Sequence, residues 1–461
     1  MNRRLLTLTL IFFSFIVASN GQEREVRTLT LEECIKTALE NNLNLKLARN
    51  DHRIAEVNYN QSKFNYLPDL NGSASYNANN SLQFDRGAIF NQTVGRINSG
   101  LETRVNLFNG FNNINTRRRD QLALEATLYD LEDTKQITEL NVLNAYLNAL
   151  NDIQNISISI ERLGLLTEQL KRSQKRVEMG VDNLEQVYNL ESEIANENLN
   201  KVTLENLYQT DLLSLLQLIQ LDPIAYKYEL EELDASIEDI TSPENYREFY
   251  QEASAISPSL KSAEIGKKVS QKNLLIAKSA TLPSVSFVAG IATSYSSNGA
   301  LNPNFDPNAP EGTPNSFSFD PNAEFGDQFF DINPQKYFGV NMNVPIFTRF
   351  ANKSAIERAR VNVNNAEISQ QQAKLNFENN LQQAYLNLLN AQSNYNAAVE
   401  NFEALDQSFK FNEASYSAGR IDFYTYLQSL NNKTRGEITL NQSKTSVILR
   451  KKILDIYRGE L

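Results

Sequence analysis

The stretch Ala145-Tyr146-Leu147-Asn148-Ala149-Leu150 occurs a second time, slightly altered, as Ala384-Tyr385-Leu386-Asn387-Leu388-Leu389. The same offset of 239 positions carries Phe108 onto Phe347 and Gly180 onto Gly419. Nearer the start of each half the offset is 215, which carries Leu67-Pro68 onto Leu282-Pro283. One duplication with 24 additional residues in the second copy explains all of these matches. The chain therefore contains an internal repeat.

The repeated stretch lies within segments that favour very long helices. No proline occurs between 69 and 222 or after 345, and proline is the residue that most strongly interrupts a helix. Apolar residues recur in steps of three and four, as in a coiled-coil stripe. They are Leu143, Leu147, Leu150, Ile153, Ile156, Ile160, Leu163, Leu166 and Leu170. We expect helices over about 111–179, 183–220, 350–416 and 422–458. The longest would span roughly 100 Å, too long for a compact globule.

Between each Leu-Pro pair and the matched phenylalanine, the apolar period changes from 3.6 to two. Strands with one apolar face are expected over about 69–79, 98–108, 284–295 and 336–347. Their length of roughly ten residues suits a tilted strand that crosses a bilayer. The proline-rich stretch 297–335 is expected to be a loop, larger than its counterpart around 80–92. A soluble α+β sandwich with coiled-coil arms would show the same alternation.

Four strands in one chain cannot close a barrel around a pore, and an open sheet edge is forbidden in lipid. Three chains would supply twelve strands, enough for a pore-forming barrel. The pattern predicts a mainly α fold with a β-barrel portion, built from duplicated helix-strand-strand-helix halves. The expected divisions are a signal peptide at 1–21, a first repeat at 22–222, a linker at 223–243 and a second repeat at 244–461.

The N-terminus has the composition of an export signal. Arg3 and Arg4 precede an apolar run that ends at Val17, followed by small and polar residues. No later apolar run approaches the ~18 residues of a membrane-spanning helix. The single cysteine, Cys34, lies well past this run. We therefore expect it to be a buried small residue on a helix and predict no lipid anchor.

Composition argues against chemistry at a catalytic or metal centre. The chain has 461 residues, a net charge of −11, and one histidine, His52. One histidine with one cysteine excludes the usual zinc sites, and no phosphate-binding glycine loop occurs. The acidic balance of the whole chain disfavours nucleic acid and anionic lipid as partners. We expect no enzyme activity, no catalytic residue, no metal and no cofactor.

The order of short motifs resembles the TolC family of outer-membrane factors over nearly the whole mature chain. The motifs are Leu29-Thr30-Leu31-Glu32-Glu33, both Leu-Pro junctions, Phe108-Asn109-Gly110, Phe347-Thr348, Met179-Gly180 and Ala418-Gly419-Arg420. The resemblance implies a homotrimer in the outer membrane of a Gram-negative bacterium. A twelve-strand barrel would be continued by a periplasmic helical barrel. It also implies docking to a periplasmic adaptor (membrane fusion) protein and an inner-membrane pump of the RND, ABC or MFS type.

The resemblance also suggests roles for particular residues. The helix-strand junctions would be at Pro68, Phe108, Pro283 and Phe347. The adaptor-contact tips would be Met179, Gly180, Ala418 and Gly419. Tyrosine and phenylalanine would form the membrane girdle, because the chain has no tryptophan. The candidates are Tyr76, Phe84, Phe90, Tyr295 and Phe338.

The expected periplasmic gate departs from relatives that carry a ring of aspartates after the second glycine turn. The matching positions here are Thr425 and Gln428, which are neutral. We expect a polar, hydrogen-bonded gate, with Asp422 and Asp182 as the acidic candidates that either line it or cap return helices. Arg420 either pairs with Asp182 or is simply solvated. Asn183 and Glu185 complete the expected gate.

The leading functional hypothesis is a passive exit duct of a tripartite efflux or type I secretion system. Such a duct would move small molecules or proteins from a pump and adaptor to the exterior. A coiled-coil structural or surface protein without a pore is one alternative. A periplasmic adaptor is another, although the duplicated strand pairs argue against it.

Overall fold

The computed structural model describes residues 25–85, 88–180, 183–232, 245–301, 304, 306–310, 313, 319–320 and 322–460. The expected signal peptide over 1–21 lies outside them. The chain divides into two compact units. The sheet unit comprises His52–Thr127 and Ser262–Gln371, and the helical unit comprises the remainder. No helix in the described part of the chain combines the length and apolarity needed to cross a membrane.

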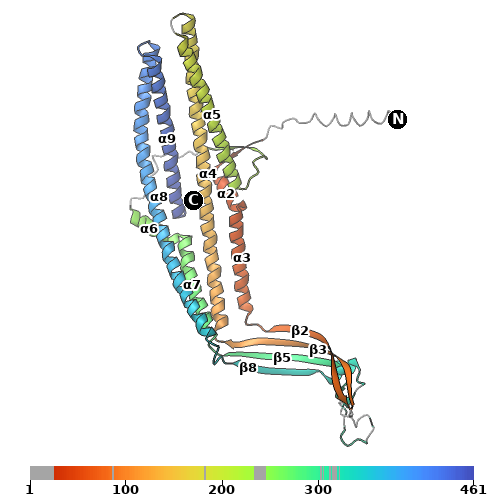
Figure 1. Ribbon diagram of the computed structural model, residues 1–461. Coiled ribbons are helices and arrows are strands. Elements are labelled where there is room, and N and C mark those ends of the chain that lie inside the picture. Colours follow the sequence, from red (N-terminus) through yellow and green to blue (C-terminus); the bar gives the residue numbers. More distant parts are fainter. Residues whose placement is uncertain are drawn as a thin grey trace, which may run out of the picture. The chain divides into compact units, whose positions relative to one another are not determined.

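The sheet unit is built on four antiparallel strands in the order β2-β3-β5-β8 (Figure 1). Their bounds are Asp69–Asp85 for β2, Ala88–Asn109 for β3, Ser284–Ser296 for β5 and Gln335–Asn343 for β8. Each repeat contributes one adjacent pair, and β3 pairs with β5 where the two repeats meet. Strands β2 and β8 are left as the two edges of this sheet.

The sheet has one apolar and one polar face, as the alternation predicts. On the apolar face Leu70 and Phe338 are 73% and 80% exposed. The strand register places Leu101 and Ile291 on this same face, both also exposed. The opposite face carries residues such as Asn71, Glu102, Arg104, Ser286 and Asn341. Because this apolar face is large and open, it requires a non-aqueous or protein partner.

The strands differ in length from the sequence prediction. The loop expected around 80–92 is instead strand, because β2 and β3 stay paired as far as Asp85 and Ala88. Strand β8 ends at Asn343, short of the predicted 347, because Pro345 lacks a backbone donor and restricts the residue before it.

The region expected as a loop at 297–335 also contains regular structure. It holds β6 (Ala300–Leu301), β7 (Phe319–Asp320) and the π-helix η3 (Asp327–Ile332). The side chain of Gln328 in η3 is fully buried, and its amide nitrogen donates to the Ser296 and Ala323 carbonyls at 3.0 and 2.7 Å. This bonding ties the loop to the end of β5.

A long helix adjoins each strand of the four-stranded sheet. Helix α3 (Leu43–Phe64) precedes β2 and α7 (Pro258–Ser279) precedes β5, whereas α4 (Asn112–Glu178) follows β3 and α8 (Ala351–Ser417) follows β8. Within the sheet unit, His52 on α3 and Thr127 on α4 are hydrogen-bonded at 3.1 Å. The ion pair Lys267–Glu367, at 2.7 Å, joins α7 to α8.

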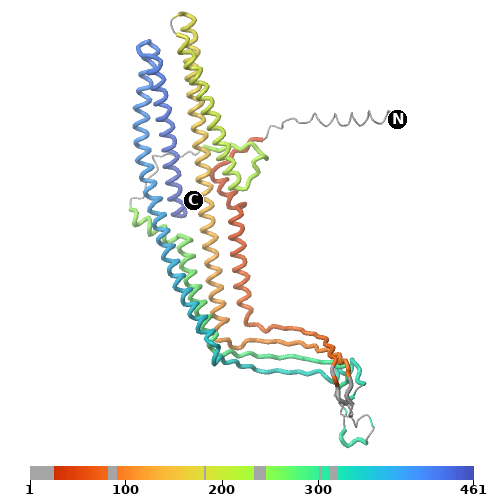
Figure 2. The backbone as a smooth tube through the Cα atoms, viewed as in Figure 1, coloured from red at the N-terminus to blue at the C-terminus, as the bar shows by residue number. Residues whose placement is uncertain are grey.

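The helical unit contains two antiparallel hairpins (Figure 2). The far part of α4 pairs with α5 (Leu184–Leu218), and that of α8 pairs with α9 (Phe423–Arg458). These bounds lie within two residues of the helices predicted from the sequence. The shorter helices α2 (Leu31–Asn41) and α6 (Tyr246–Ile256) belong to the same unit.

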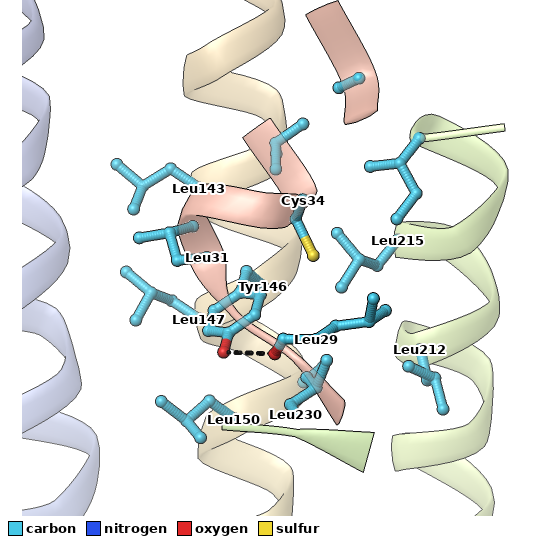
Figure 3. Close-up of a cluster of buried hydrophobic side chains, with 14 of the residues drawn as sticks. Leu29, Leu31, Cys34, Leu143, Tyr146, Leu147, Leu150, Leu212, Leu215 and Leu230 are labelled. Atoms are coloured by element: carbon cyan, nitrogen blue, oxygen red, sulfur yellow. Dashed lines mark hydrogen bonds between the residues drawn. The ribbon is translucent and has the colours of Figure 1, made fainter. Parts of the chain in front are cut away.

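A buried core surrounds the first copy of the repeated motif (Figure 3). The Tyr146 hydroxyl is hydrogen-bonded to the carbonyls of Leu29 and Glu231 at 3.1 and 2.6 Å. Cys34 lies in this core, and burial raises the pKa of its thiol to about 12. The second copy of the motif also adjoins a buried core, since the half-buried Tyr385 packs against a separate cluster of buried residues that includes Leu381 and Leu388.

One element was not foreseen. Strand β4 (Lys227–Leu230) lies inside the expected linker 223–243 and pairs in parallel with β1 (Val26–Leu29). The two strands are far apart in sequence, so neither segment alone reveals the pairing. The division into two repeats around a linker stays a prediction.

Candidate functional site

The turn between α8 and α9 depends on glycine. Gly419 has φ +71°, a left-handed value that residues with a Cβ rarely adopt. Its N–H donates to the Tyr416 carbonyl at 2.9 Å, and the Arg420 N–H donates to the Ser415 carbonyl at 2.8 Å. These two bonds form a Schellman motif, which ends a helix and reverses the chain. Both Gly419 and Arg420 are exposed at this tip.

Asp422 caps the N-terminus of α9. Its Oδ1 accepts the Thr425 backbone N–H at 2.8 Å, and its Oδ2 accepts the Thr425 hydroxyl at 3.0 Å. These hydrogen bonds stabilise the ionised form and hold the pKa of Asp422 below its usual range. Thr425 is half-buried and Gln428 is exposed. Of the two roles considered for Asp422, the structure displays capping directly.

The turn between α4 and α5 repeats this design. Gly180 has φ +73°, and its N–H donates to the Val177 carbonyl at 2.9 Å. Asn183 caps α5 by accepting the Glu185 N–H at 3.3 Å, and the Asn183, Glu185 and Met179 side chains are exposed. Asp182, and with it the expected Arg420–Asp182 pair, lies outside the described residues.

Aromatic packing joins the two hairpins near their tips. Tyr426 is fully buried and stacks on Tyr416 with ring centroids 4.9 Å apart. Phe423 and Phe409 also contact it, and Leu166 and Leu190 from the first hairpin belong to the same cluster. Sequence reasoning missed this cluster, although Phe423, Tyr426 and Leu430 have the i, i+3, i+7 spacing of a buried helix face.

A polar cluster forms a second link between the hairpins. Arg162 on α4 pairs with the buried Glu197 on α5 at 3.0 Å and donates to the Asn431 side chain on α9 at 2.6 Å. Glu197 also accepts hydrogen bonds from Ser159 and Asn200. A buried carboxylate requires such partners, because its desolvation is costly otherwise. No sequence signal pointed to these residues, because the link joins two repeats.

The helix-strand junctions have the same geometry in both repeats. Phe108 and Phe111 meet edge to face with centroids 5.2 Å apart, and Phe347 and Phe350 do so at 5.8 Å. The second phenylalanine of each pair has positive φ, +67° and +62°, which is strained for a bulky residue. The preceding junctions at Pro68 and Pro283 follow turns closed by Leu67 and Leu282 N–H groups.

Gly110 explains why the first junction is compact. Its φ is +64°, and a Cβ there would lie 2.5 Å from the Ser279 carbonyl oxygen. Only glycine therefore permits β3 to pass this close to the end of α7. Of the predicted girdle residues, Tyr76 and Phe338 are exposed on the apolar face. Tyr295 packs edge to face against Phe325.

The sequence of the chain is similar to that of one known protein family. A family model described as outer membrane efflux protein matches residues 34–219 and 249–447, more than half of the chain. No curated protein matches the chain at a significant level.

Several solved outer-membrane channels share the fold. OprN has a TM-score of 0.74 at 16% identity, covering 94% of this chain and 90% of its own. Campylobacter jejuni CmeC has a TM-score of 0.69 at 17% sequence identity, and the match covers 94% of this chain and 86% of CmeC. The open state of Neisseria gonorrhoeae MtrE has a TM-score of 0.65 at 18% sequence identity, and the match covers 93% of this chain and 88% of MtrE.

Proposed function

Because the chain belongs to the outer membrane efflux protein family, we propose that it is the passive exit duct of a tripartite efflux or type I secretion system. In this role it receives small molecules or proteins from a pump and an adaptor and releases them outside the cell.

Family membership fixes the broader statements. The chain is an outer-membrane efflux channel of a Gram-negative bacterium and is not an enzyme. The predicted TolC-like resemblance and fold class are confirmed. The alternatives of a pore-free surface protein and a periplasmic adaptor are thereby set aside.

The observation that carries the proposal is the pair of unpaired sheet edges. Strands β2 and β8 end the four-stranded sheet, and each would expose a row of backbone N–H and C=O groups to lipid. Pairing β2 of one copy with β8 of the next satisfies both edges at once. Three copies close a twelve-stranded barrel, with the apolar faces toward lipid and the polar faces toward the lumen.

The helices next to these edges support the same arrangement. In the sheet unit, α3 exposes Ile54, Val57 and Phe64, and α8 exposes Val361 and Ile368. Steps of three and seven place each set on one face of its helix. These stripes are suited to contact between neighbouring copies in a coiled-coil fashion.

We assign the gate to the glycine tips of the two hairpins. Asp422, Thr425 and Gln428 follow one tip, and Asn183 and Glu185 follow the other. The gate is polar, and its acidic groups are Asp422 and Asp182 rather than a ring at Thr425 and Gln428. The exposed residues Met179, Gly180, Ala418 and Gly419 are the adaptor contacts. The partners are two further copies, an adaptor and an RND, ABC or MFS pump.

The test combines fractionation, gel mobility and conductance. The full chain is expected in the outer-membrane fraction, as a trimer whose gel mobility changes on heating. Its reconstitution into planar bilayers should give discrete conductance steps. A soluble monomer, or an outer-membrane trimer that conducts no ions even after the tips are loosened by Gly419→Ala and Asp422→Ala, would overturn the proposal.

A further inference from the structure

Basic residues are concentrated where the helices of the sheet unit meet the strands. The windows 58–68, 110–119, 269–283 and 344–356 contain no aspartate or glutamate. They do contain eight basic residues, although the whole chain carries a net charge of −11. The eight are Lys63, Arg117, Arg118, Arg119, Lys272, Lys278, Arg349 and Lys353.

Six of these basic residues are exposed and form no ion pair within the described residues. We call them the junction rim: Lys63, Arg117, Arg118, Lys278, Arg349 and Lys353. By contrast, Arg119 pairs with the buried Asp120 at 2.7 Å. Lys63 lies 4.1 Å from the centroid of the Tyr59 ring and bonds to Asn60, so no acidic group neutralises it. The rim is therefore a local positive surface on an acidic protein.

Exposed apolar side chains accompany the rim on the same helix faces. On α4, Arg118 follows Ile114, which is 40% exposed, by one turn. On α7, Lys278 follows Leu275, which is 39% exposed, by three residues. At the start of α8, Lys353 follows Phe350 by the same spacing. Long basic side chains next to exposed apolar residues are typical of a membrane interface. The aliphatic part of each side chain stays in the apolar layer, and its charged end reaches the lipid head groups.

The direction of this surface follows from the junction phenylalanines. Phe108 is paired in register with Val285 of β5, on the apolar face of the sheet. Phe111, directly before α4, contacts Phe108 edge to face. The apolar face of the sheet thus continues onto the start of α4, toward Ile114 and Arg118. A lumen-facing rim would instead continue the polar face that carries Glu102 and Arg104.

We propose that the junction rim binds the head groups of anionic phospholipids in the membrane leaflet that faces the periplasm. The inference rests on the proposed function, which places the apolar face of the sheet in lipid. The ammonium and guanidinium groups of the rim carry positive charge at the end of the apolar face of the sheet. They would attract the negatively charged phosphate groups of lipids at that depth. This contact sets the depth at which the sheet unit lies in the membrane.

The test measures lipid bound to the purified full-length trimer in neutral detergent, by native mass spectrometry. The probes are phosphatidylglycerol and phosphatidylcholine, which differ in net charge. Wild type is expected to retain phosphatidylglycerol in preference, and Arg118→Gln/Lys278→Gln/Lys353→Gln is expected to lose roughly tenfold or more of that preference. High salt should have a similar effect on wild type, because the groups are exposed.

A matched control removes the same charge elsewhere. Lys171→Gln/Lys175→Gln/Lys444→Gln changes three exposed lysines outside the sheet unit and should leave the lipid preference unchanged. Equal retention of the two lipids by wild type, or equal losses in both triple variants, would overturn the proposal. Conductance of each variant is recorded in parallel. A conducting trimer without lipid preference refutes only the rim, whereas absence of trimer and conductance refutes the duct.

Discussion

The Tyr337 hydroxyl on β8 donates a 2.9 Å hydrogen bond to Oε2 of Glu102 on β3, across the intervening strand β5. Gly290 on β5 makes this contact possible, because a Cβ there would lie 2.6 Å from the Tyr337 ring. The other carboxylate oxygen of Glu102 pairs with Arg104 at 3.1 Å. One tyrosine therefore fixes a charged group on the polar face of the sheet two strands away.

Gly290→Ala tests the hydrogen bond between Tyr337 and Glu102. The added methyl group displaces the Tyr337 ring, since the Leu101 carbonyl oxygen at 2.8 Å blocks retreat on the other side. We expect a loss of about 1–3 kcal/mol, as for overpacking elsewhere. It is measured as a lower dissociation temperature of the trimer on gels. Gly339→Ala is the matched control, because a Cβ there meets no atom within 4 Å. Equal effects of the two variants would contradict a stabilising role for the contact between Tyr337 and Glu102.

Gly419→Ala should weaken the tip of the second hairpin. No atom lies within 4 Å of a Cβ at this position, so the loss comes from the left-handed backbone alone, roughly 1–2 kcal/mol. Thermal unfolding followed by the helix signal measures it. Gly164→Ala, in the middle of α4 with equally open surroundings, is the control and should stabilise by about 1 kcal/mol. Stabilisation by both variants would show that the turn does not require glycine.

Asp422→Asn tests the acidic part of the proposed gate. Asparagine is also a good cap, so α9 should keep its start while the charge is lost. We expect reduced cation preference in planar bilayers. Because the folded pKa lies below the usual value, the ionised cap is fully present above the ordinary aspartate pKa of about 3.9. It is lost only as the pH falls further through the lowered pKa. An unchanged conductance and ion preference in Asp422→Asn would remove Asp422 from the gate.

Arg162→Met should destabilise the helical unit. Removal of the guanidinium leaves the carboxylate of Glu197, whose side chain is 5% exposed, without its cation, which costs about 3–5 kcal/mol. The double variant with Glu197→Gln should recover much of that loss. A denaturant double-mutant cycle quantifies the coupling, and Lys433→Met, which removes a more exposed pair with Glu161, provides the comparison. Additive losses in the cycle would indicate that Arg162 and Glu197 act independently.

The stability of the protein should depend on pH through Asp152 on α4. Burial, together with the neighbouring carboxylate of Asp211 on α5, raises its pKa to about 6. A raised carboxyl pKa means that the folded state holds a proton that the unfolded state releases, so stability falls as pH rises from about 4 to 6. Asp152→Asn should remove this fall and stabilise the protein at pH 7 by on the order of 1 kcal/mol. Urea unfolding at pH 4.5 and 7 measures it. The exposed Glu400→Gln should leave the pH dependence as in wild type.

Local features of the sequence determined the helices and their ends. The helix period, the absence of proline and the left-handed requirement at Gly180 and Gly419 are properties of short segments. For that reason α4, α5, α8 and α9 lie within two residues of their predicted bounds. The duplication of Ala145-Tyr146 as Ala384-Tyr385, with the order of the short motifs, was also sufficient to identify the family.

The tertiary structure decided what depends on partners distant in the chain. Asn79 lies in a strand because Val94 pairs with it, and β4 exists because β1 lies beside it. The contacts of Arg162 with Asn431 and of Tyr337 with Glu102 join separate repeats. A periodic pattern records which face of an element is buried, but not which residue lies opposite. That choice is made by long-range packing, which no single segment contains.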